Sequence, residues 1–346
     1  MIAMTDAQQA RVHPFRGEAA PMPDADAGAR WVSLFWKVTT FGTQVTQLDY
    51  WKRGVAHAPA PFGDRMRAAI ESFEGLAPAR DPEIEAVMLA MLDYWSRRGM
   101  NIKEAQGGGN DRYFPIDAWF IWRWLAAGGL PFALRVLETF PRVDIDASRA
   151  GSPDTHALAI TPRDGSRWWC LEVGHLGIFQ VLRRVIATSN DYAAGVAEAA
   201  RIRAQAPLFL RAALAFAFPD EPWWQADLRD ATPKKKGARL PAEAWGLATT
   251  RVEEAAIAPI LDSMARDSQP FATDTAHYGY TLVKRFGDGA AKHLLAYLAV
   301  VKDWWAKEQF GDALALTETA ETKAFFASKL KDRTLGKLAK AYVKNA

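Results

Sequence analysis

Apolar residues recur at helix-length intervals in the C-terminal third of the chain. Three runs, Glu254 to Ala265, Gly289 to Val300 and Ala320 to Lys331, follow one another at offsets of 35 and then 31 residues. Each begins with small residues and a charge and has a bulky apolar pair near its middle: Ile260-Leu261, Leu294-Leu295 and Phe325-Phe326. A repeat of this length is typical of stacked helical hairpins, because one hairpin cannot bury its apolar face alone. The pattern predicts an all-α fold in which antiparallel helix pairs stack into an α-solenoid.

Helical spacing also marks the N-terminal half. Apolar residues three and four apart predict a helix over 29–52, and Asp81 followed by Pro82 predicts the capped start of a helix over 82–98. Residues 117–127 carry bulky side chains around most of a helix, which is typical of burial between neighbours; the tryptophans are Trp119, Trp122 and Trp124. A further helix is expected over 131–140. We therefore expect a Trp-rich helical block over residues 29–140.

Polar and proline-rich stretches divide the chain. Residues 1–28 have scattered charges, prolines and no apolar core segment, so we expect a flexible tail. Residues 141–166 are rich in Pro, Gly, Asp and Ser, with short β-like runs at 143–145 and 157–161, and are expected to form a long loop at a domain boundary. Helices are expected again over 168–188, 192–205 and 207–218. Helical repeats would then occupy residues 167–346.

Two stretches resemble a known family. Residues 313–322, continuing through 330–332 to 339–342, are similar to the HEAT-like helical repeats of bacterial proteins related to the molybdate metabolism regulator, as is the segment 211–224. The resemblance covers mainly residues 195–346 and implies a HEAT-like stack in a bacterial protein, with no catalytic residues to carry over. Members of that family often carry a Trp-Gly-Arg domain, whereas Trp245-Gly246 is followed here by Leu247 in a helical context. The resemblance thus concerns the fold.

Composition favours a cytoplasmic globular protein. Of the 346 residues, 49% are hydrophobic, which is ample for a sizeable core. The single cysteine, Cys170, excludes an internal disulfide framework and favours a reducing compartment. The longest apolar stretches fall short of the roughly 20 residues that span a bilayer. We therefore expect no membrane segment.

Positive charge gathers at the C-terminus, although the net charge is only +3. Five cations are spaced by three or four residues: Lys329, Arg333, Lys337, Lys340 and Lys344. Apolar residues are expected on the opposite side of what reads as one last helix. Such a row could neutralise phosphates along a nucleic-acid backbone. The other interpretation is a solvated outer face on a terminal repeat.

Tryptophan is abundant, with 14 copies, several of them in adjacent pairs. Neighbours on a helix point about 100° apart, so one ring of each pair is expected to be buried and the other to lie near the rim. The candidates for contact with a partner are Trp168, Trp223 and Trp304. Such rings could fill a partner's pocket or stack on bases, and the alternative is packing between repeats.

Local sequence contains no specific catalytic or metal-binding motif. The six histidines lack the spacing of a zinc site, and Gly107 to Gly109 lacks the Lys-Ser or Lys-Thr of a P-loop. Cys170 and His175 are five residues apart and do not share a helix face. We expect no catalytic residue, cofactor or metal site. An active site assembled from distant residues stays open, as does the oligomeric state.

Two functions from different classes remain. The first is a non-enzymatic, cytoplasmic helical-repeat scaffold that binds a protein partner, and it follows from the repeat pattern and the lack of a catalytic motif. The alternative is a nucleic-acid-binding helical-repeat protein, regulatory or repair-related, that uses the basic C-terminal row.

Overall fold

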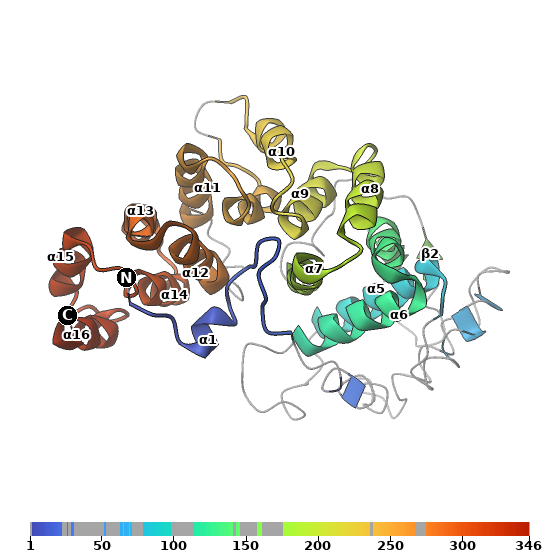
Figure 1. The fold of residues 1–346 in the computed structure, drawn as a ribbon, viewed down its shortest axis with the longest axis horizontal. Coiled ribbons are helices and arrows are strands. Elements are labelled where there is room, and N and C mark those ends of the chain that lie inside the picture. Colours follow the sequence, from blue (N-terminus) through green and yellow to red (C-terminus); the bar gives the residue numbers. More distant parts are fainter. Residues whose placement is uncertain are drawn as a thin grey trace, which may run out of the picture. The chain divides into compact units, whose positions relative to one another are not determined.

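The computed structural model describes residues 2–22, 79–97, 114–140, 143–145, 158–160, 176–235, 238–266 and 275–345, with isolated helical residues between 26 and 70 (Figure 1). Regular structure in these residues is helical apart from two strands, β1 (Val143–Ile145) and β2 (Leu158–Ile160). The strands pair antiparallel with Val143 opposite Ile160. They coincide with the two β-like runs, and the rest of the expected loop at 141–166 lies outside the described residues. The all-α class is confirmed.

The chain forms two compact units. Unit 1 consists of residues 1–21, 183–189 and 208–346, and unit 2 consists of residues 22–182 and 190–207. The division falls within helix α7 (Leu176–Thr188) and close to both ends of α8 (Tyr192–Arg203). The boundary expected at 141–166 falls inside unit 2, where β1 and β2 pair.

Unit 2 contains α5 (Pro82–Arg97), α6 (Phe114–Thr139), α8 and the first half of α7. The predicted N-cap of α5 is confirmed, because the Asp81 carboxylate accepts from the backbone N–H groups of Glu83 and Ile84 at 3.0 and 3.4 Å. Helix α6 is interrupted at Gly128 and Gly129, and Gly129 has a φ of 71° that favours glycine. Pro131 then lies in the first turn of the second part, as expected.

The interface of α5 and α6 contains a buried ion pair. Arg123 donates to both carboxylate oxygens of Glu85 at 2.9 to 3.0 Å, and Trp124 donates to the same carboxylate at 3.0 Å. Trp119 and Trp124 are buried as expected. The expectation for Trp122 is wrong, since that ring is 42% exposed. Arg123, the next residue, is buried instead in the ion pair with Glu85. One side of α6 therefore faces solvent although most of the helix is apolar.

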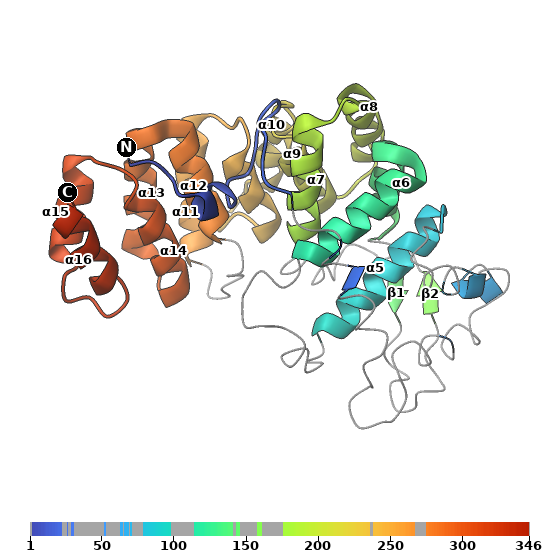
Figure 2. The ribbon, with the colours of Figure 1, turned by 60° about the horizontal axis from the view of Figure 1, so that its bottom comes forward.

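Unit 1 is built from the later helices, which appear in order along it in both Figure 1 and Figure 2. They are α9 (Leu208–Ala217), α10 (Trp224–Ala231), the 3-10 helix η3 (Ala242–Thr249), α11 (Glu254–Arg266), α12 (Thr275–Phe286), the 3-10 helix η4 (Gly287–Ala290), α13 (Ala291–Val300), α14 (Trp304–Leu314), α15 (Ala320–Ser328) and α16 (Gly336–Asn345). The three runs found by the repeat pattern are α11, α13 and α15. Their existence as helices is confirmed.

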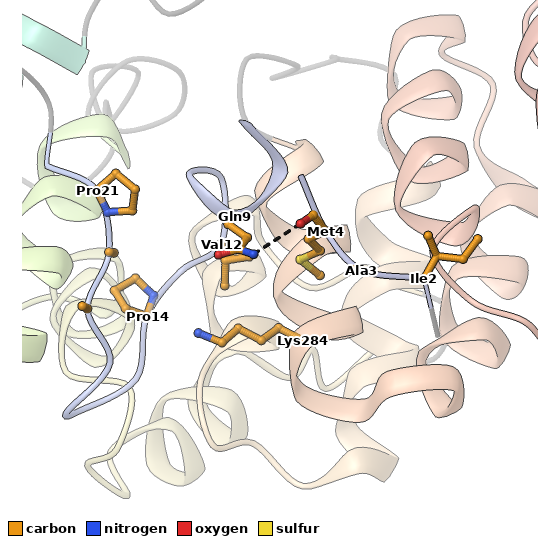
Figure 3. A pocket seen from close by; sticks show the side chains of 10 residues that line it. Ile2, Ala3, Met4, Gln9, Val12, Pro14, Pro21 and Lys284 are labelled. Carbon is orange, nitrogen blue, oxygen red and sulfur yellow. Dashed lines mark hydrogen bonds between the residues drawn. The ribbon is translucent and has the colours of Figure 1, made fainter. Parts of the chain in front are cut away.

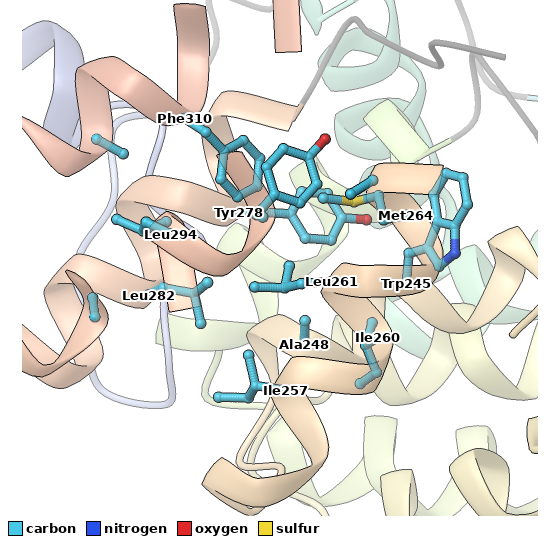
Figure 4. Close-up of a cluster of buried hydrophobic side chains, with 14 of the residues drawn as sticks. Trp245, Ala248, Ile257, Ile260, Leu261, Met264, Tyr278, Leu282, Leu294 and Phe310 are labelled. Carbon is cyan, nitrogen blue, oxygen red and sulfur yellow. The ribbon is translucent and has the colours of Figure 1, made fainter. Parts of the chain in front are cut away.

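These helices pack on their next-but-one neighbours as well as on adjacent ones. Helix α11 contacts α13, α13 contacts α15, and α12 contacts α14, while α13 contacts α14 and α15 contacts α16. The core between them includes Leu261, Leu294 and Phe310 (Figure 4). Tyr297 stacks on Phe310 with ring centroids 3.8 Å apart. The apolar pairs at the middle of the three runs thus supply fully buried residues in each, namely Ile260, Leu294 and Phe326.

The N-terminal segment, defined as residues 2–21, belongs to unit 1. The prediction of a flexible tail is wrong here: the backbone N–H of Ile2 donates to Leu316 O at 2.8 Å, and residues 12–15 are buried. Helix α1 (Asp6–Gln9) begins with a capping box made by Thr5 and Gln8. The segment is ordered because the short run Val12 to Phe15 packs into unit 1 and forms hydrogen bonds with side chains of its helices.

Candidate functional site

A group of buried polar side chains lies where the N-terminal segment packs against the helices of unit 1. Arg183 and Arg184 are in the second half of α7, His277 and Thr281 are on α12, and Thr249 ends η3. We call these five residues the segment site. All five are buried, and together they hold residues 10–21 of the segment.

Arg183 is the centre of the segment site. Its Nε donates to Pro14 O at 2.8 Å and its Nη2 to Thr249 O at 2.8 Å and His13 O at 3.4 Å. Its Nη1 donates to Phe216 O at 3.2 Å and to the Thr249 hydroxyl at 3.0 Å. Burial lowers the pKa of Arg183 to about 9, and the more distant Asp220 and Glu18 offset part of this. The guanidinium is therefore a buried cation, and its hydrogen bonds go to carbonyl and hydroxyl oxygens.

Arg184 also binds the backbone of the segment. Its Nη1 donates to Pro21 O and its Nη2 to Ala10 O, both at 2.5 Å. Residues 10 and 21 lie on either side of the buried residues 12–15, so one side chain joins the two limbs of the segment. Every residue supplies a backbone carbonyl whatever its side chain, so these contacts carry no preference for sequence.

The segment in turn covers the C-terminal end of α7. Arg16 donates to Ile186 O and Ala187 O at 3.2 and 2.9 Å, and Gly17 N donates to Ala187 O at 2.8 Å. The last carbonyls of a helix have no partner within the helix, and a cation near them is stabilised by the helix dipole. Gly17 has a φ of 84°, which a glycine adopts without strain.

His13 is buried without polar partners for its ring. Its backbone N–H donates to the Thr281 hydroxyl at 2.9 Å, while its imidazole stacks on His277 with centroids 5.1 Å apart and meets the edge of Phe216. Among the described residues, neither ring nitrogen of His13 has a hydrogen-bond partner. Burial, and after it His277, Arg183 and Arg184, hold the pKa of His13 well below its usual value. The ring is therefore neutral at pH 7.

The first part of the segment is anchored on α12 and α14. Gln8 donates to Asp312 at 3.1 Å, and the Tyr280 hydroxyl donates to the same carboxylate oxygen. Burial and this carboxylate raise the pKa of Tyr280 above its usual range. Asp312 thus accepts from both a helix of unit 1 and the segment.

A cavity of about 360 Å³ lies beside the segment (Figure 3). Its wall is mostly apolar and comes from both limbs of the segment, with Met4 and Val12 on one and Pro14 and Pro21 on the other. Lys284 of α12 completes the wall, and its ammonium group is paired with Glu18 at 2.8 Å. The segment therefore leaves space unfilled where it crosses unit 1.

The basic row predicted at the C-terminus is divided between two helices and a turn, so its expected place on one helix is wrong. Lys329 is the C-cap of α15 and lies 5.5 Å from the centre of the Phe325 ring, and Arg333 is in the following turn. Asp332 ends the continuity, because its carboxylate accepts from the N–H groups of Thr334 and Leu335 at 2.9 Å and caps α16. These bonds, that to Leu335 first, lower the pKa of Asp332.

Three cations of the row share α16. Lys337, Lys340 and Lys344 are exposed, whereas Ala339 and Tyr342 on the other side of the helix are buried. Tyr342 donates to Thr317 O at 2.9 Å. The expected division of the last helix into a core face and a cationic face is therefore found over residues 336–345.

The predicted partner-contact tryptophans have different environments. Trp304, the first residue of α14, is 63% exposed. Trp223 is half-buried against Phe218, with ring centroids 5.7 Å apart, and its neighbour Trp224 is buried. Trp168 lies outside the described residues, as do Cys170 and His175. A role of any of these rings in binding stays a prediction.

Sequence reasoning missed the segment site, because its residues come from three separate parts of the chain, α7, η3 and α12. Two signals pointed to it. Arg183 and Arg184 interrupt an otherwise apolar stretch of α7, and Val12 to Phe15 is an apolar cluster within a polar terminus. No group of three or more His, Cys, Asp or Glu side chains suited to a metal ion occurs among the described residues.

Comparisons with protein-family models, curated proteins and solved structures found no match to this chain. The resemblance to the HEAT-like repeats related to the molybdate metabolism regulator therefore stays a prediction. In the described part of the chain, one helical stretch, Asp117–Thr139, is long and apolar enough to cross a membrane. Of the 18-residue window that meets the criteria, 56% is buried inside the protein, and the core helix of a soluble protein meets the same criteria.

Proposed function

We propose that this protein is a non-enzymatic, cytoplasmic scaffold that binds a protein partner through unit 1, and that unit 1 is a HEAT-like stack of antiparallel helix pairs. Support for the stack comes from the packing of α11 on α13, of α13 on α15 and of α12 on α14. Successive layers of this kind expose an extended surface, which is how helical-repeat proteins bind their partners.

The observation that carries the proposal is that unit 1 already holds a non-helical stretch of polypeptide. Residues 10–21 are bound by side chains of α7 and α12 that donate to backbone carbonyls, as Arg183 and Arg184 do, or accept from a backbone N–H, as Thr281 does. Because every polypeptide offers these backbone groups, the surface has the chemistry needed to bind another chain.

A photoreactive residue tests the proposal. We place one at Trp304 of α14 in the full chain and, as a control, one at Trp122 of α6, which is also exposed. After irradiation in lysate of the source cells at low and at high salt, a specific protein should be joined to the Trp304 position and not to the Trp122 position. Equal labelling from both positions, or none, would refute binding through unit 1.

The exposed lysines of α16 favour the alternative, a nucleic-acid-binding helical repeat. Lys337, Lys340 and Lys344 share the face opposite Ala339 and Tyr342. A row of three exposed ammonium groups with this spacing can follow a phosphate backbone. Binding that weakens steeply with salt would support this function, and its absence at low salt would remove it.

A further inference from the structure

We propose that the N-terminal segment is an internal ligand of unit 1, and that the segment site takes an extended segment of the partner with the order aliphatic, apolar ring, proline, aromatic. This inference rests on the proposed function, since it names the site and the chemistry of the partner. It goes beyond that function in assigning residues 2–21 to the role of a competitor that occupies the same site.

The anchor of the segment is short. Val12, His13, Pro14 and Phe15 are buried, whereas most of residues 2–11 and 16–21 are exposed or half-buried. The centre of the Phe15 ring lies 5.2 Å from the guanidinium carbon of Arg183 and 4.2 Å from that of Arg251. Cations at this distance favour the face of an aromatic ring. The fourth position of the anchor is therefore selective for an aromatic residue.

The first position, Val12, favours an aliphatic side chain because of its packing, and the third, Pro14, favours a residue without a backbone N–H. Val12 packs in the same core cluster as Tyr278 and Leu282, so an aliphatic side chain suits it. Pro14 has no N–H, and its carbonyl accepts from Arg183. At this buried position a residue with an N–H would need an additional acceptor.

The second position is where the internal ligand fits poorly. His13 places two ring nitrogens among His277, Phe216 and Tyr278, and neither nitrogen has a hydrogen-bond partner in the described residues. A phenyl ring of similar size would make the same ring contacts without burying unpaired polar atoms. A partner with Phe at this position should therefore bind more tightly than the protein's own segment.

The cavity also indicates that another segment could fit this site better than residues 2–21 do. It lies between the limbs of the segment, where small residues such as Ala3, Ala19 and Ala20 form part of the wall. This pocket of about 360 Å³ is partly open to solvent and lined by both apolar and polar atoms, and the segment leaves it unfilled. A partner segment with larger side chains at these positions would fill it.

The test uses the full chain with a protease cleavage site inserted between Pro23 and Asp24. Cleavage leaves every residue present but converts the segment into a separate peptide that can exchange. We then add a fluorescent peptide with the sequence of residues 2–21 and follow its anisotropy. The competitors are the unlabelled peptide, the same peptide with His13→Phe, and a scrambled peptide.

We expect the labelled peptide to exchange into the cleaved protein and the His13→Phe peptide to compete about tenfold better than the native one, which is the effect of removing one buried unpaired polar group. The scrambled peptide should not compete. In the protein, Thr281→Val removes the acceptor of His13 N and should weaken binding several-fold, whereas Thr250→Val should not, since that buried hydroxyl donates to Leu247 O within its own turn.

Two results would overturn the inference. If the cleaved protein keeps its segment against excess peptide for days, or loses its helical circular dichroism when the segment is dialysed away, residues 2–21 are part of the core and not a ligand. If the peptide fails to exchange but Trp304 still labels a specific protein, the proposed function stands and only the assignment of this site falls. If the peptide exchanges but Trp304 labels nothing, the site stands without that partner.

Discussion

At the scale of single residues, His13 makes the stability of unit 1 depend on pH. Its pKa is lowered in the folded protein, so below the unfolded value of about 6.5 the unfolded chain binds more protons than the folded chain. The free energy of unfolding is therefore fully retained above that pH and falls as the pH decreases below it, by up to about 1.4 kcal/mol per pH unit.

Urea unfolding between pH 5 and pH 8 measures this effect, with His13→Leu as the comparison. The variant should lose most of the slope between pH 5 and 6.5 and gain about 1 kcal/mol at pH 7, because it buries no unpaired nitrogen. His293, whose pKa is also lowered by burial, stays in both proteins and cancels in the difference. Identical slopes for the two proteins would show that His13 does not titrate on unfolding.

Arg183 should be the most sensitive cation in unit 1. Replacing it with Met leaves the carbonyls of Pro14, Phe216 and Thr249 buried without their donor, and we expect a loss of about 3–5 kcal/mol. Arg201→Met is the matched control, since that side chain is 53% exposed and its ion pairs with Glu138 and Glu198 contribute little, within about 1 kcal/mol. Chemical denaturation of both variants would decide, and similar losses would contradict the central role of Arg183.

At the scale of elements, Gly279 reports how closely α12 and α14 pack. A Cβ atom added at Gly279 would lie 2.7 Å from the Cβ of Ala313, which cannot rotate away. Gly279→Ala should therefore force the two helices apart and cost about 1–3 kcal/mol of stability. Thermal unfolding measures this.

Gly289→Ala is the control for that substitution, because the nearest atom to its added Cβ is 3.8 Å away, an ordinary contact. Its effect should stay within about 0.5 kcal/mol. Equal melting temperatures for the two variants would mean that α12 and α14 do not pack as closely as the structure has them, and the layered arrangement of unit 1 would lose its support.

The sequence predicted helix boundaries well where a capping residue or a proline marks the end of a helix. Asp81 with Pro82 gave the beginning of α5, and Pro219 follows directly after α9 and the buried Phe218. The same reasoning failed at the basic row, because spacing alone does not show that Asp332 caps a new helix. Three of the cations lie on α16, whereas Lys329 is the C-cap of α15 and Arg333 lies in the turn that precedes α16.

At the scale of the whole molecule, contacts between distant residues escaped prediction. His13 meets Thr281, and Arg183 meets Pro14, across separations of 268 and 169 residues. Helical periodicity reports only which face of one element is buried, so it could identify the repeat-like helices of unit 1 but not the segment that crosses them. For this reason residues 2–21 read as a tail, although their anchor is as buried as the helical core.

The two proposed functions differ in how the whole molecule should respond to salt. If α16 binds a nucleic-acid backbone, the logarithm of the affinity for a DNA duplex should fall linearly with the logarithm of salt concentration, and reversing Lys337, Lys340 and Lys344 to Glu should reduce that slope by about 3. Reversing three other exposed lysines, Lys234, Lys235 and Lys302, is the control with the same change in net charge. The protein-partner function instead predicts no retardation of DNA at low salt, and the lysines of α16 then only solvate the last helix. A large and equal loss in both triple variants would indicate attraction to overall charge, because a binding row must depend on where its charges lie.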